Sequence, residues 1–98
     1  MLVGVFDAAE GREADLAGVL ARYVVVSRGE DGCRNIDLVA SLLAPGRFLV
    51  YEKWDSPEAQ AQHMAGPVMA ELAEGVSPLL RGSPDLGLFM ALSAHDLL

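Results

Sequence analysis

Acidic and aromatic side chains in the middle of the sequence could perform acid–base chemistry. Glu52 and Asp37 are carboxylates in two stretches rich in apolar residues, and a half-apolar pocket raises the pKa of a carboxylate, which lets it act as a base near neutral pH. The indole of Trp54 is flat, can stack on an aromatic ligand and can donate one hydrogen bond. His63 titrates near neutral pH and can shuttle a proton. These four residues are the candidate catalytic groups.

Neighbouring residues could bind the substrate. Asn35 and Ser41 can orient a ligand or stabilise an oxyanion, and Val50 and Phe48 can supply apolar contacts to a ring. Each candidate also has a purely structural alternative, because indoles pack in subunit interfaces, carboxylates form salt bridges and small polar groups hydrogen-bond in wet interfaces. The two histidines have no paired cysteine or carboxylate spacing, so we expect no metal site.

Composition limits the classes of partner. The 98 residues suit one domain over residues 1–98, and a 52% hydrophobic content favours an oligomer, since a small monomer buries little surface. A net charge of -7 argues against nucleic acid or an anionic membrane as partner. No apolar run approaches the roughly 20 residues of a membrane span. Met1–Phe6 lacks the basic region of a signal peptide, and the single Cys33 excludes an internal disulfide, so we expect a cytoplasmic protein.

Hydrophobic periodicity, together with proline and glycine punctuation, predicts the secondary structure. A period near 3.6 indicates helices, whereas short apolar runs bounded by turn residues indicate strands. No structure is predicted for the tail from Ala94. The predicted elements are a strand over Leu2–Asp7, a helix over Glu13–Ser27, a hairpin with arms Cys33–Leu43 and Arg47–Trp54, a helix from Pro57 to about Met64, a helical segment over Pro67–Val76 and a strand over Asp85–Leu92.

The hairpin turn predicts which side chains share a face of the sheet. Pro45-Gly46 is typical of a type II turn, in which glycine takes the positive φ. With these two residues as the loop, Ala44 lies opposite Arg47, and the same register pairs Leu43 with Phe48, Ser41 with Val50, Val39 with Glu52, and Asp37 with Trp54. One face then carries Ile36, Leu38, Ala40, Leu42, Leu49, Tyr51 and Lys53, and should pack on helices. The other face is half polar and carries Asn35, Asp37, Val39, Ser41, Phe48, Val50, Glu52 and Trp54.

The predicted order of strand, helix, strand, strand, helix, strand is that of a ferredoxin-like α+β fold with an antiparallel sheet. Helices cover one face of such a sheet, and no predicted element is left to cover the half-polar face. A second copy of the same sheet is the simplest cover. We therefore expect a homodimer with a half-polar pocket between each sheet and the dimer interface.

The stretch from Tyr51 to Ala59, with His63 after it, resembles the antibiotic biosynthesis monooxygenase family, whose members commonly show Tyr-Glu-x-Trp, then Ser-x-x-Ala, then a histidine. Glu30-Asp31-Gly32-Cys33 is similar to the Glu-Pro-Gly-Cys that leads into the family's second strand. The resemblance runs through most of the chain. It implies a dimeric α+β barrel in which two four-stranded sheets pack face to face.

Some members of that family carry groups that this chain lacks. Val50 stands where polyketide-oxidising members have an asparagine, although Asn35 lies on the same predicted face, and Ile36 stands where many members have a tyrosine. Haem-degrading members have a haem-ligating histidine at the position of Ala73 and an asparagine in the first strand, and Leu2–Asp7 contains none. We therefore expect no haem.

The resemblance also implies oxygen insertion into polycyclic phenols or anthrones without metal or flavin. The expected function is that of a cofactor-independent monooxygenase that oxidises a small phenolic or quinol-type compound with O2. The ring would lie against Trp54, and Glu52, Asp37 or His63 would take a proton. The alternative is a non-catalytic small-ligand-binding or stress-related dimer.

Overall fold

A computed structural model of the chain describes residues 1–90 and 92. Its four strands form one antiparallel sheet in the order β2-β3-β1-β4, with β1 paired to both β3 and β4. This is the predicted ferredoxin-like α+β architecture. The elements are β1 (Leu2–Asp7), α1 (Glu13–Arg28), β2 (Cys33–Ala40), β3 (Arg47–Trp54), α2 (Pro57–Met64), α3 (Pro67–Val76), a 3-10 turn η1 (Ser77–Leu79) and β4 (Asp85–Leu88).

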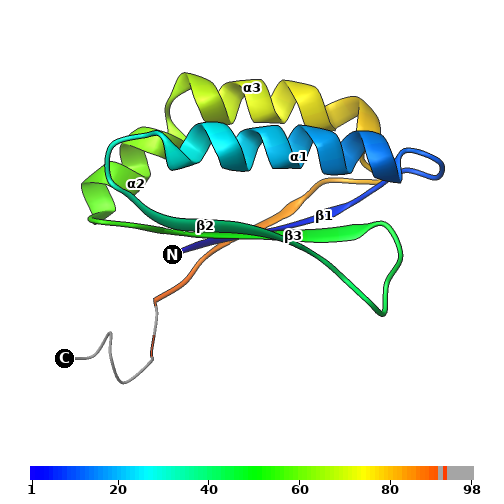
Figure 1. Ribbon diagram of the computed structural model, residues 1–98, viewed down its shortest axis with the longest axis horizontal. Coiled ribbons are helices and arrows are strands. Elements are labelled where there is room, and N and C mark those ends of the chain that lie inside the picture. The colour runs from blue at the N-terminus through cyan, green and yellow to red at the C-terminus, as the bar shows by residue number, and fades with distance from the viewer. Residues whose placement is uncertain (91, 93–98) are drawn as a thin grey trace.

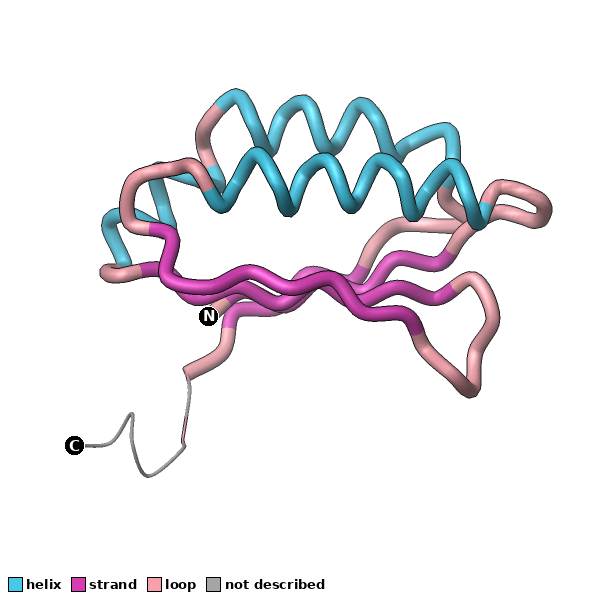
Figure 2. Tube along the Cα trace, viewed as in Figure 1, coloured by secondary structure: helices cyan, strands magenta, loops and turns pink. Residues whose placement is uncertain are grey.

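The helices lie on one face of the sheet and leave the other face bare (Figures 1 and 2). The predicted apolar stripe of α1 faces the sheet, and its central residues Leu16 and Leu20 are fully buried. They pack with Ile36 and Val50 from the sheet and with Leu72 from α3 in one core cluster. Burial of such aliphatic side chains stabilises the fold by about 1.5–3 kcal/mol each.

The predicted register of the β2–β3 hairpin is wrong. Glu52 lies opposite Ile36, three residues before Val39, and Phe48 lies opposite Ala40 in place of Leu43. Strand β2 accordingly ends at Ala40, where the prediction extended it to Leu43. A β-bulge between Cys33 and Asn35 further interrupts the pairing near Trp54, which lies opposite Cys33.

The cause of the shift is the side chain of Ser41. The turn itself forms as predicted, with Arg47 N donating to Ala44 O at 3.1 Å and Gly46 at φ 82°. The Ser41 hydroxyl, however, accepts hydrogen bonds from the backbone N–H groups of Leu43 and Ala44, at 3.2 and 3.0 Å. This local turn competes with the strand ladder. Ser41 N then donates to Arg47 O at 2.9 Å, and the five residues 42–46 are left outside the pairing, three more than the predicted two-residue loop.

Because side chains alternate between the two faces of a sheet, a register shift of three residues places the side chains of β3 on the opposite face from the one predicted relative to β2. On the helix-covered face, Ile36, Val50, Glu52 and Trp54 are all buried. Asn35, Asp37 and Val39 lie on the face that the helices leave bare, as predicted. Leu49, Tyr51 and Lys53, which were predicted to face the helices, lie beside them. The predicted half-polar face therefore does not exist as one surface, and Glu52 and Asp37 lie on opposite sides of the sheet.

The ends of the elements show smaller differences. Helix α1 extends to Arg28, one residue beyond the prediction, and β4 ends at Leu88 where the prediction reached Leu92. Ser77-Pro78, predicted as a loop, begins the 3-10 turn. The tail from Ala94 lies outside the described residues. Among the described residues, no helix is long and apolar enough to cross a membrane.

Candidate functional site

The carboxylate of Glu52 is buried between the sheet and the helices. Its side chain is only 1% exposed, yet both of its oxygens have partners. The hydroxyl of Tyr23, from α1, donates to Oε2 at 2.8 Å, and the indole Nε1–H of Trp54 donates to Oε1 at 2.9 Å. A buried charge is tolerated only when it is hydrogen-bonded in this way. Because each carboxylate oxygen has two acceptor sites, Glu52 can still accept a further proton or hydrogen bond.

His63 joins this carboxylate to a second one. Its Nε2 lies 2.7 Å from the Tyr23 hydroxyl and 3.3 Å from Glu52 Oε1, while its Nδ1 lies 2.5 Å from Glu30 Oε2. The imidazole also stacks on Trp54, with ring centroids 4.3 Å apart and 26° between the ring planes. The result is a continuous chain of polar contacts from Glu52 to Glu30 through one histidine.

The protonation of His63 follows from its neighbours. Burial lowers the pKa of the imidazole, but the hydrogen bond and charge of Glu52, together with those of Glu30, outweigh burial and raise it above its ordinary value. With both nitrogens protonated, Nδ1–H donates to Glu30 and Nε2–H donates to Tyr23, whose hydroxyl donates to Glu52. Every donor in the chain then has an acceptor. Burial, followed by the charge of Glu52, strongly raises the pKa of Tyr23, which therefore stays protonated.

Local sequence explains why α2 presents His63 to the sheet. The Ser56 hydroxyl accepts from Ala59 N at 3.1 Å and caps the helix, and Pro57 fits its first turn. The short helix ends at Met64, with Ala65 as its C-cap, and Gly66 is the N-cap of α3, which begins at Pro67. In this eight-residue helix His63 is the buried residue, at 3% exposed, so one histidine near its C-terminal end points inward.

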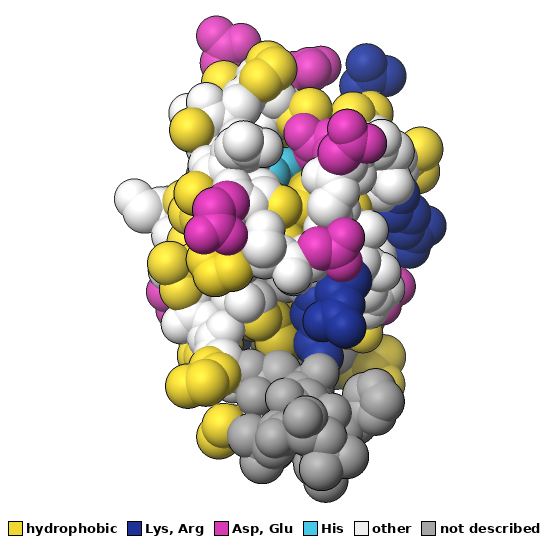
Figure 3. Space-filling view, turned by 90° about the vertical axis from the view of Figure 1, so that its left-hand side faces the viewer, with side chains coloured by type: hydrophobic (Ala, Val, Ile, Leu, Met, Phe, Trp, Pro, Cys, Tyr) yellow, Lys and Arg dark blue, Asp and Glu magenta, His cyan; other side chains and the backbone are white. Residues whose placement is uncertain are grey.

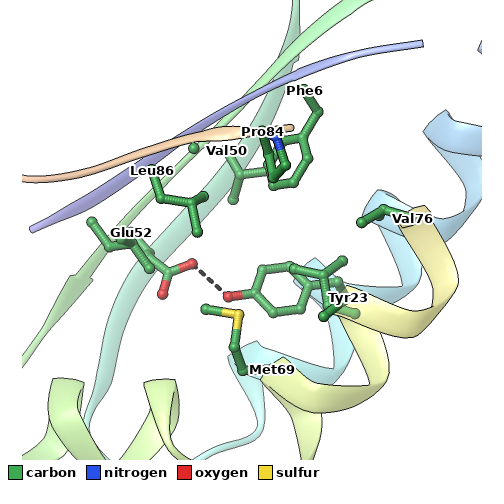
Figure 4. A pocket seen from close by; sticks show the side chains of 12 residues that line it. Phe6, Tyr23, Val50, Glu52, Met69, Val76, Pro84 and Leu86 are labelled. Carbon is green, nitrogen blue, oxygen red and sulfur yellow. Dashed lines mark hydrogen bonds between the residues drawn. The ribbon is translucent and has the colours of Figure 1, made fainter. Parts of the chain in front are cut away.

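A small cavity lies beside Glu52, between the sheet and helices α1 and α3 (Figure 4). Its volume is about 70 Å³. The walls are apolar except at one end, where the Tyr23 hydroxyl and the Glu52 carboxylate meet (Figure 4). This cavity lies within one chain, between its sheet and its helices, and is therefore a different place from the predicted pocket at a dimer interface. Its lining residues are Leu2, Gly4, Phe6, Tyr23, Val50, Glu52, Met69, Leu72, Ala73, Val76, Pro84 and Leu86.

A second hollow of about 200 Å³ reaches the other end of the polar chain from the protein surface. Glu30, Asp31, Gln62, His63 and Trp54 contribute to its lining. Figure 3 looks onto this end of the molecule, where acidic side chains gather at the surface. His63 therefore lies between an inner apolar cavity and an outer acidic hollow.

The structure brings some of the predicted site residues together and separates others. Glu52, Trp54 and His63 form the buried centre, and Val50 lines the cavity. Phe48 packs against the core.

The remaining candidates lie elsewhere. Asp37 lies on the bare face, where it accepts hydrogen bonds from Tyr51 at 2.9 Å and from Asn35 at 3.3 Å. Ser41 lies in the hairpin turn. Trp54 does not line the cavity, since its ring is covered by His63.

Sequence reasoning did not single out Tyr23 and Glu30, the two other members of the buried polar chain. Tyr23 falls within the apolar stripe of α1, and the signal was its hydroxyl, which needs a partner when buried. Glu30 belongs to the Glu-x-Gly-Cys stretch that resembles the family, but it is 33 residues from His63. Within the described part of the chain, no three His, Cys, Asp or Glu side chains are arranged to hold a metal ion.

The fold agrees with what comparison with known proteins shows. Topology alone places the chain among ferredoxin-like α+β proteins. The sequence model of the antibiotic biosynthesis monooxygenase family matches residues 1–75, and the chain belongs to that family. No curated protein matches the sequence.

Solved structures resemble the chain over nearly its whole length. A protein of Deinococcus radiodurans, whose name places it among the antibiotic biosynthesis monooxygenases, is 27% identical with a TM-score of 0.86 and covers 96% of this chain and 95% of its own. PA3566 from Pseudomonas aeruginosa is 26% identical with a TM-score of 0.76 and 92% of each chain covered. Rv0793 from Mycobacterium tuberculosis is 24% identical with a TM-score of 0.85, over 94% of this chain and 93% of its own.

Proposed function

We propose that the protein is a cofactor-independent monooxygenase that uses O2 to oxidise a small, one-ring phenol or hydroquinone, with Glu52 as the base. The observation that carries this proposal is the position of the Glu52 carboxylate at the polar end of an otherwise apolar cavity (Figure 4). Membership of a family named for monooxygenases supports it.

The reaction can be written without an added reductant. Glu52 takes the phenolic proton, and a ring carbon of the resulting anion bonds to O2, which accepts the electrons. Glu52 returns the proton to the peroxide and then takes the hydrogen of the same ring carbon. The O–O bond breaks, a carbonyl forms and water leaves, so that phenol plus O2 gives quinone plus water. The apolar walls favour this sequence, because they keep bulk water from the anion and the peroxide.

His63 and Tyr23 assist this chemistry from behind the carboxylate. A protonated imidazole 3.3 Å from Glu52 Oε1 offsets the negative charge that the substrate anion brings into the cavity. The Tyr23 hydroxyl lies at the cavity end and can hydrogen-bond a substrate oxygen. Asp37 has no part in this mechanism, because it faces the other side of the sheet.

Cavity size restricts the substrate. A cavity of about 150 Å³ lined by aliphatic and aromatic side chains binds benzene, whereas the cavity here measures about 70 Å³. One ring therefore enters only if the lining gives way, and a three-ring anthrone requires far more room. Met69 is flexible and Leu86 is half exposed, so these two side chains are the ones that can move.

The direct test is oxygen uptake by metal-free protein with a panel of phenols, hydroquinones and anthrones. We expect uptake with one-ring compounds, and a loss of about 100-fold or more in Glu52→Gln. Glu74→Gln, which changes an exposed glutamate on α3, is the matched control and should keep full activity. Thermal stabilisation by these compounds without turnover of any of them would contradict the proposal and favour a ligand-binding protein.

We also propose that two copies pack through the bare face of the sheet. That face carries Val39, Leu49 and Tyr51, and no part of residues 1–90 covers it (Figure 1). The hairpin tip, with Leu42 and Leu43 at 97% and 96% exposed, projects beyond the same side of the sheet (Figure 1). Exposed apolar surface of this extent is typical of interfaces.

Sedimentation tests the dimer. We expect a particle of twice 10.4 kDa at micromolar concentration. Leu49→Lys should dissociate it, whereas Val25→Lys, on the exposed side of α1, should not. A wild-type particle of 10.4 kDa would overturn this second proposal.

A further inference from the structure

The loop that carries Glu30 is fixed from three directions. Glu30 N donates to Ser27 O at 3.0 Å, and Cys33 N donates to Glu30 O at 3.2 Å, which ties the residue to the end of α1 and the start of β2. Asp55 N donates to Gly32 O at 2.8 Å and joins the loop to the end of β3. Helix α2 closes the third side, since a Cβ on Gly32 would lie 2.7 Å from that of Ala59. The backbone beneath Glu30 is therefore held in place.

The Glu30 carboxylate is the solvent-side end of the polar chain. Its side chain is 27% exposed, whereas that of His63 is 1% exposed, and the two are 2.5 Å apart. The groups in contact with His63 are Tyr23 from α1, Glu52 and Trp54 from β3, and Glu30 from the loop. Asp31 is a further charged residue that lines the same hollow as His63. Glu30 is the one that meets Nδ1 and that also lines the outer hollow.

We propose that Glu30 is a positioning residue that fixes a proton on Nδ1 of His63 and so holds the imidazole with Nε2 directed at Tyr23 and Glu52. The carboxylate accepts the Nδ1–H hydrogen bond and leaves the ring one orientation. Nε2 is then the nitrogen that responds to the cavity. It donates to the Tyr23 hydroxyl when the imidazole is protonated; when the imidazole is neutral, it can accept the single Tyr23 proton only if Tyr23 stops donating to Glu52. The outer hollow lets this proton equilibrate with solvent while the cavity is occupied.

This role deepens the proposed function and rests on it only for its catalytic consequence. With Glu30 ionised, the imidazolium lies between two carboxylates, and a substrate anion in the cavity meets a fixed positive charge. Without the negative charge of Glu30, the imidazole is expected to lose its second proton at lower pH, and the substrate anion then loses the positive charge of the imidazolium. The positioning itself is a property of the folded protein and can be measured without any turnover.

Nitrogen NMR of the histidine side chains tests the proposal directly. The full-length protein, with 15N-labelled histidine, is titrated from pH 5 to 9, and the His63 signals are assigned by comparison with His95→Gln. In the wild type we expect the proton on Nδ1 to persist after the ring becomes neutral. In Glu30→Gln we expect His63 to titrate about one pH unit or more lower. Glu30→Asp, which keeps the charge, should restore at least half of that difference.

Asp31→Asn is the matched control, because Asp31 lines the same hollow as Glu30. In Asp31→Asn, His63 should titrate at the same pH as in the wild type. Any one of three results would overturn the proposal. His63 could titrate within 0.2 pH unit of the wild type in Glu30→Gln, or Asp31→Asn could shift this titration as much as Glu30→Gln does. The third result is a neutral wild-type imidazole that carries its proton on Nε2.

Oxygen uptake separates this proposal from the proposed function. If a phenol is turned over, the pH profile of kcat/KM should move in Glu30→Gln in the same direction as the NMR titration. If no phenol is turned over, but His63 still titrates at lower pH in Glu30→Gln than in the wild type, the monooxygenase proposal fails and the role of Glu30 stands. If a phenol is turned over but the pKa of His63 is the same in Glu30→Gln as in the wild type, the proposed role of Glu30 fails and the monooxygenase proposal stands.

Discussion

The Tyr23 hydroxyl and the Glu52 carboxylate, 29 positions apart in the sequence, meet at 2.8 Å in the interior of the fold. The contact joins α1 to β3 and forms the polar end of the cavity. It exists because the β2–β3 register directs Glu52 toward the helices and the α1 stripe directs Tyr23 toward the sheet. Site and fold therefore depend on the same side chains.

Tyr23→Phe should lower both stability and activity. Removing the hydroxyl leaves Glu52 and His63 buried with one partner fewer each, which costs about 1–3 kcal/mol of unfolding free energy. Urea unfolding at one protein concentration measures this loss. Arg12→Gln is the control, because the ion pair of Arg12 with Asp15 lies exposed at the start of α1, away from the bare face, and should contribute less than about 1 kcal/mol. Equal losses in the two variants would show that the buried contact is not special.

The stability of the protein should depend on pH through His63. Its folded-state pKa is raised above the unfolded value near 6.5, with burial opposing the shift and Glu52 and Glu30 causing it. The folded state therefore holds the proton more tightly. The resulting stabilisation is complete below about pH 6.5 and is lost as pH rises through the folded-state pKa.

Unfolding free energies measured from pH 5.5 to 9 test this dependence. Relative to His63→Gln, the wild type should lose stability across that window, by up to about 1.4 kcal/mol per pH unit between the two pKa values. His95→Gln should follow the wild type, because it changes the other histidine of the sequence. A wild-type curve parallel to that of His63→Gln would contradict the raised pKa of His63.

Trp54→Phe distinguishes substrate binding from support of Glu52. Phenylalanine keeps a ring over His63 but removes the N–H that donates to Glu52 Oε1 at 2.9 Å. We expect kcat for oxygen uptake to fall roughly 10- to 100-fold with KM nearly unchanged, because the indole does not line the cavity. A rise in KM with constant kcat would mean that the indole contacts the substrate, as the sequence had suggested.

Gly32→Ala should disturb the loop that holds Glu30. Gly32 has φ 84°, and an added Cβ would lie 2.7 Å from the Cβ of Ala59, so a cost of about 1–3 kcal/mol is expected. Gly18→Ala is the matched control, since nothing lies within 4 Å of its Cβ position in α1. This change should raise the unfolding free energy by about 0.5–1 kcal/mol. Thermal melts test both expectations: the melting temperature should fall in Gly32→Ala and rise in Gly18→Ala.

Much of the fold could be predicted from the sequence because its signals are local. The apolar period of α1, the cap at Ser56 and the turn at Pro45-Gly46 each act over a few residues, and all three formed as predicted. The alternation of Glu52 and Trp54 likewise placed both on one face of β3. Element order then followed from these short-range patterns.

The sequence did not predict that the face of β3 with Glu52 and Trp54 lies toward the helices. This depends on the register of β2 and β3, which is set by the residue at which their pairing begins after the turn. A single hydroxyl, that of Ser41, holds three more residues outside the pairing than predicted and inverts β3 relative to β2. The same inversion removed Asp37 from the site and brought in Tyr23. Contacts such as that between Glu30 and His63 join distant segments, and no local pattern specifies them.

Isotope labelling tests most directly whether Glu52 drives oxygen insertion. Metal-free protein is supplied with 18O2 and a one-ring phenol or hydroquinone that it consumes, and the product is analysed by mass spectrometry. The proposed mechanism predicts one 18O atom in the product carbonyl, the second in water, and almost no labelled product from Glu52→Gln. An unlabelled quinone formed with hydrogen peroxide, or equal labelling by wild type and Glu52→Gln, would contradict it.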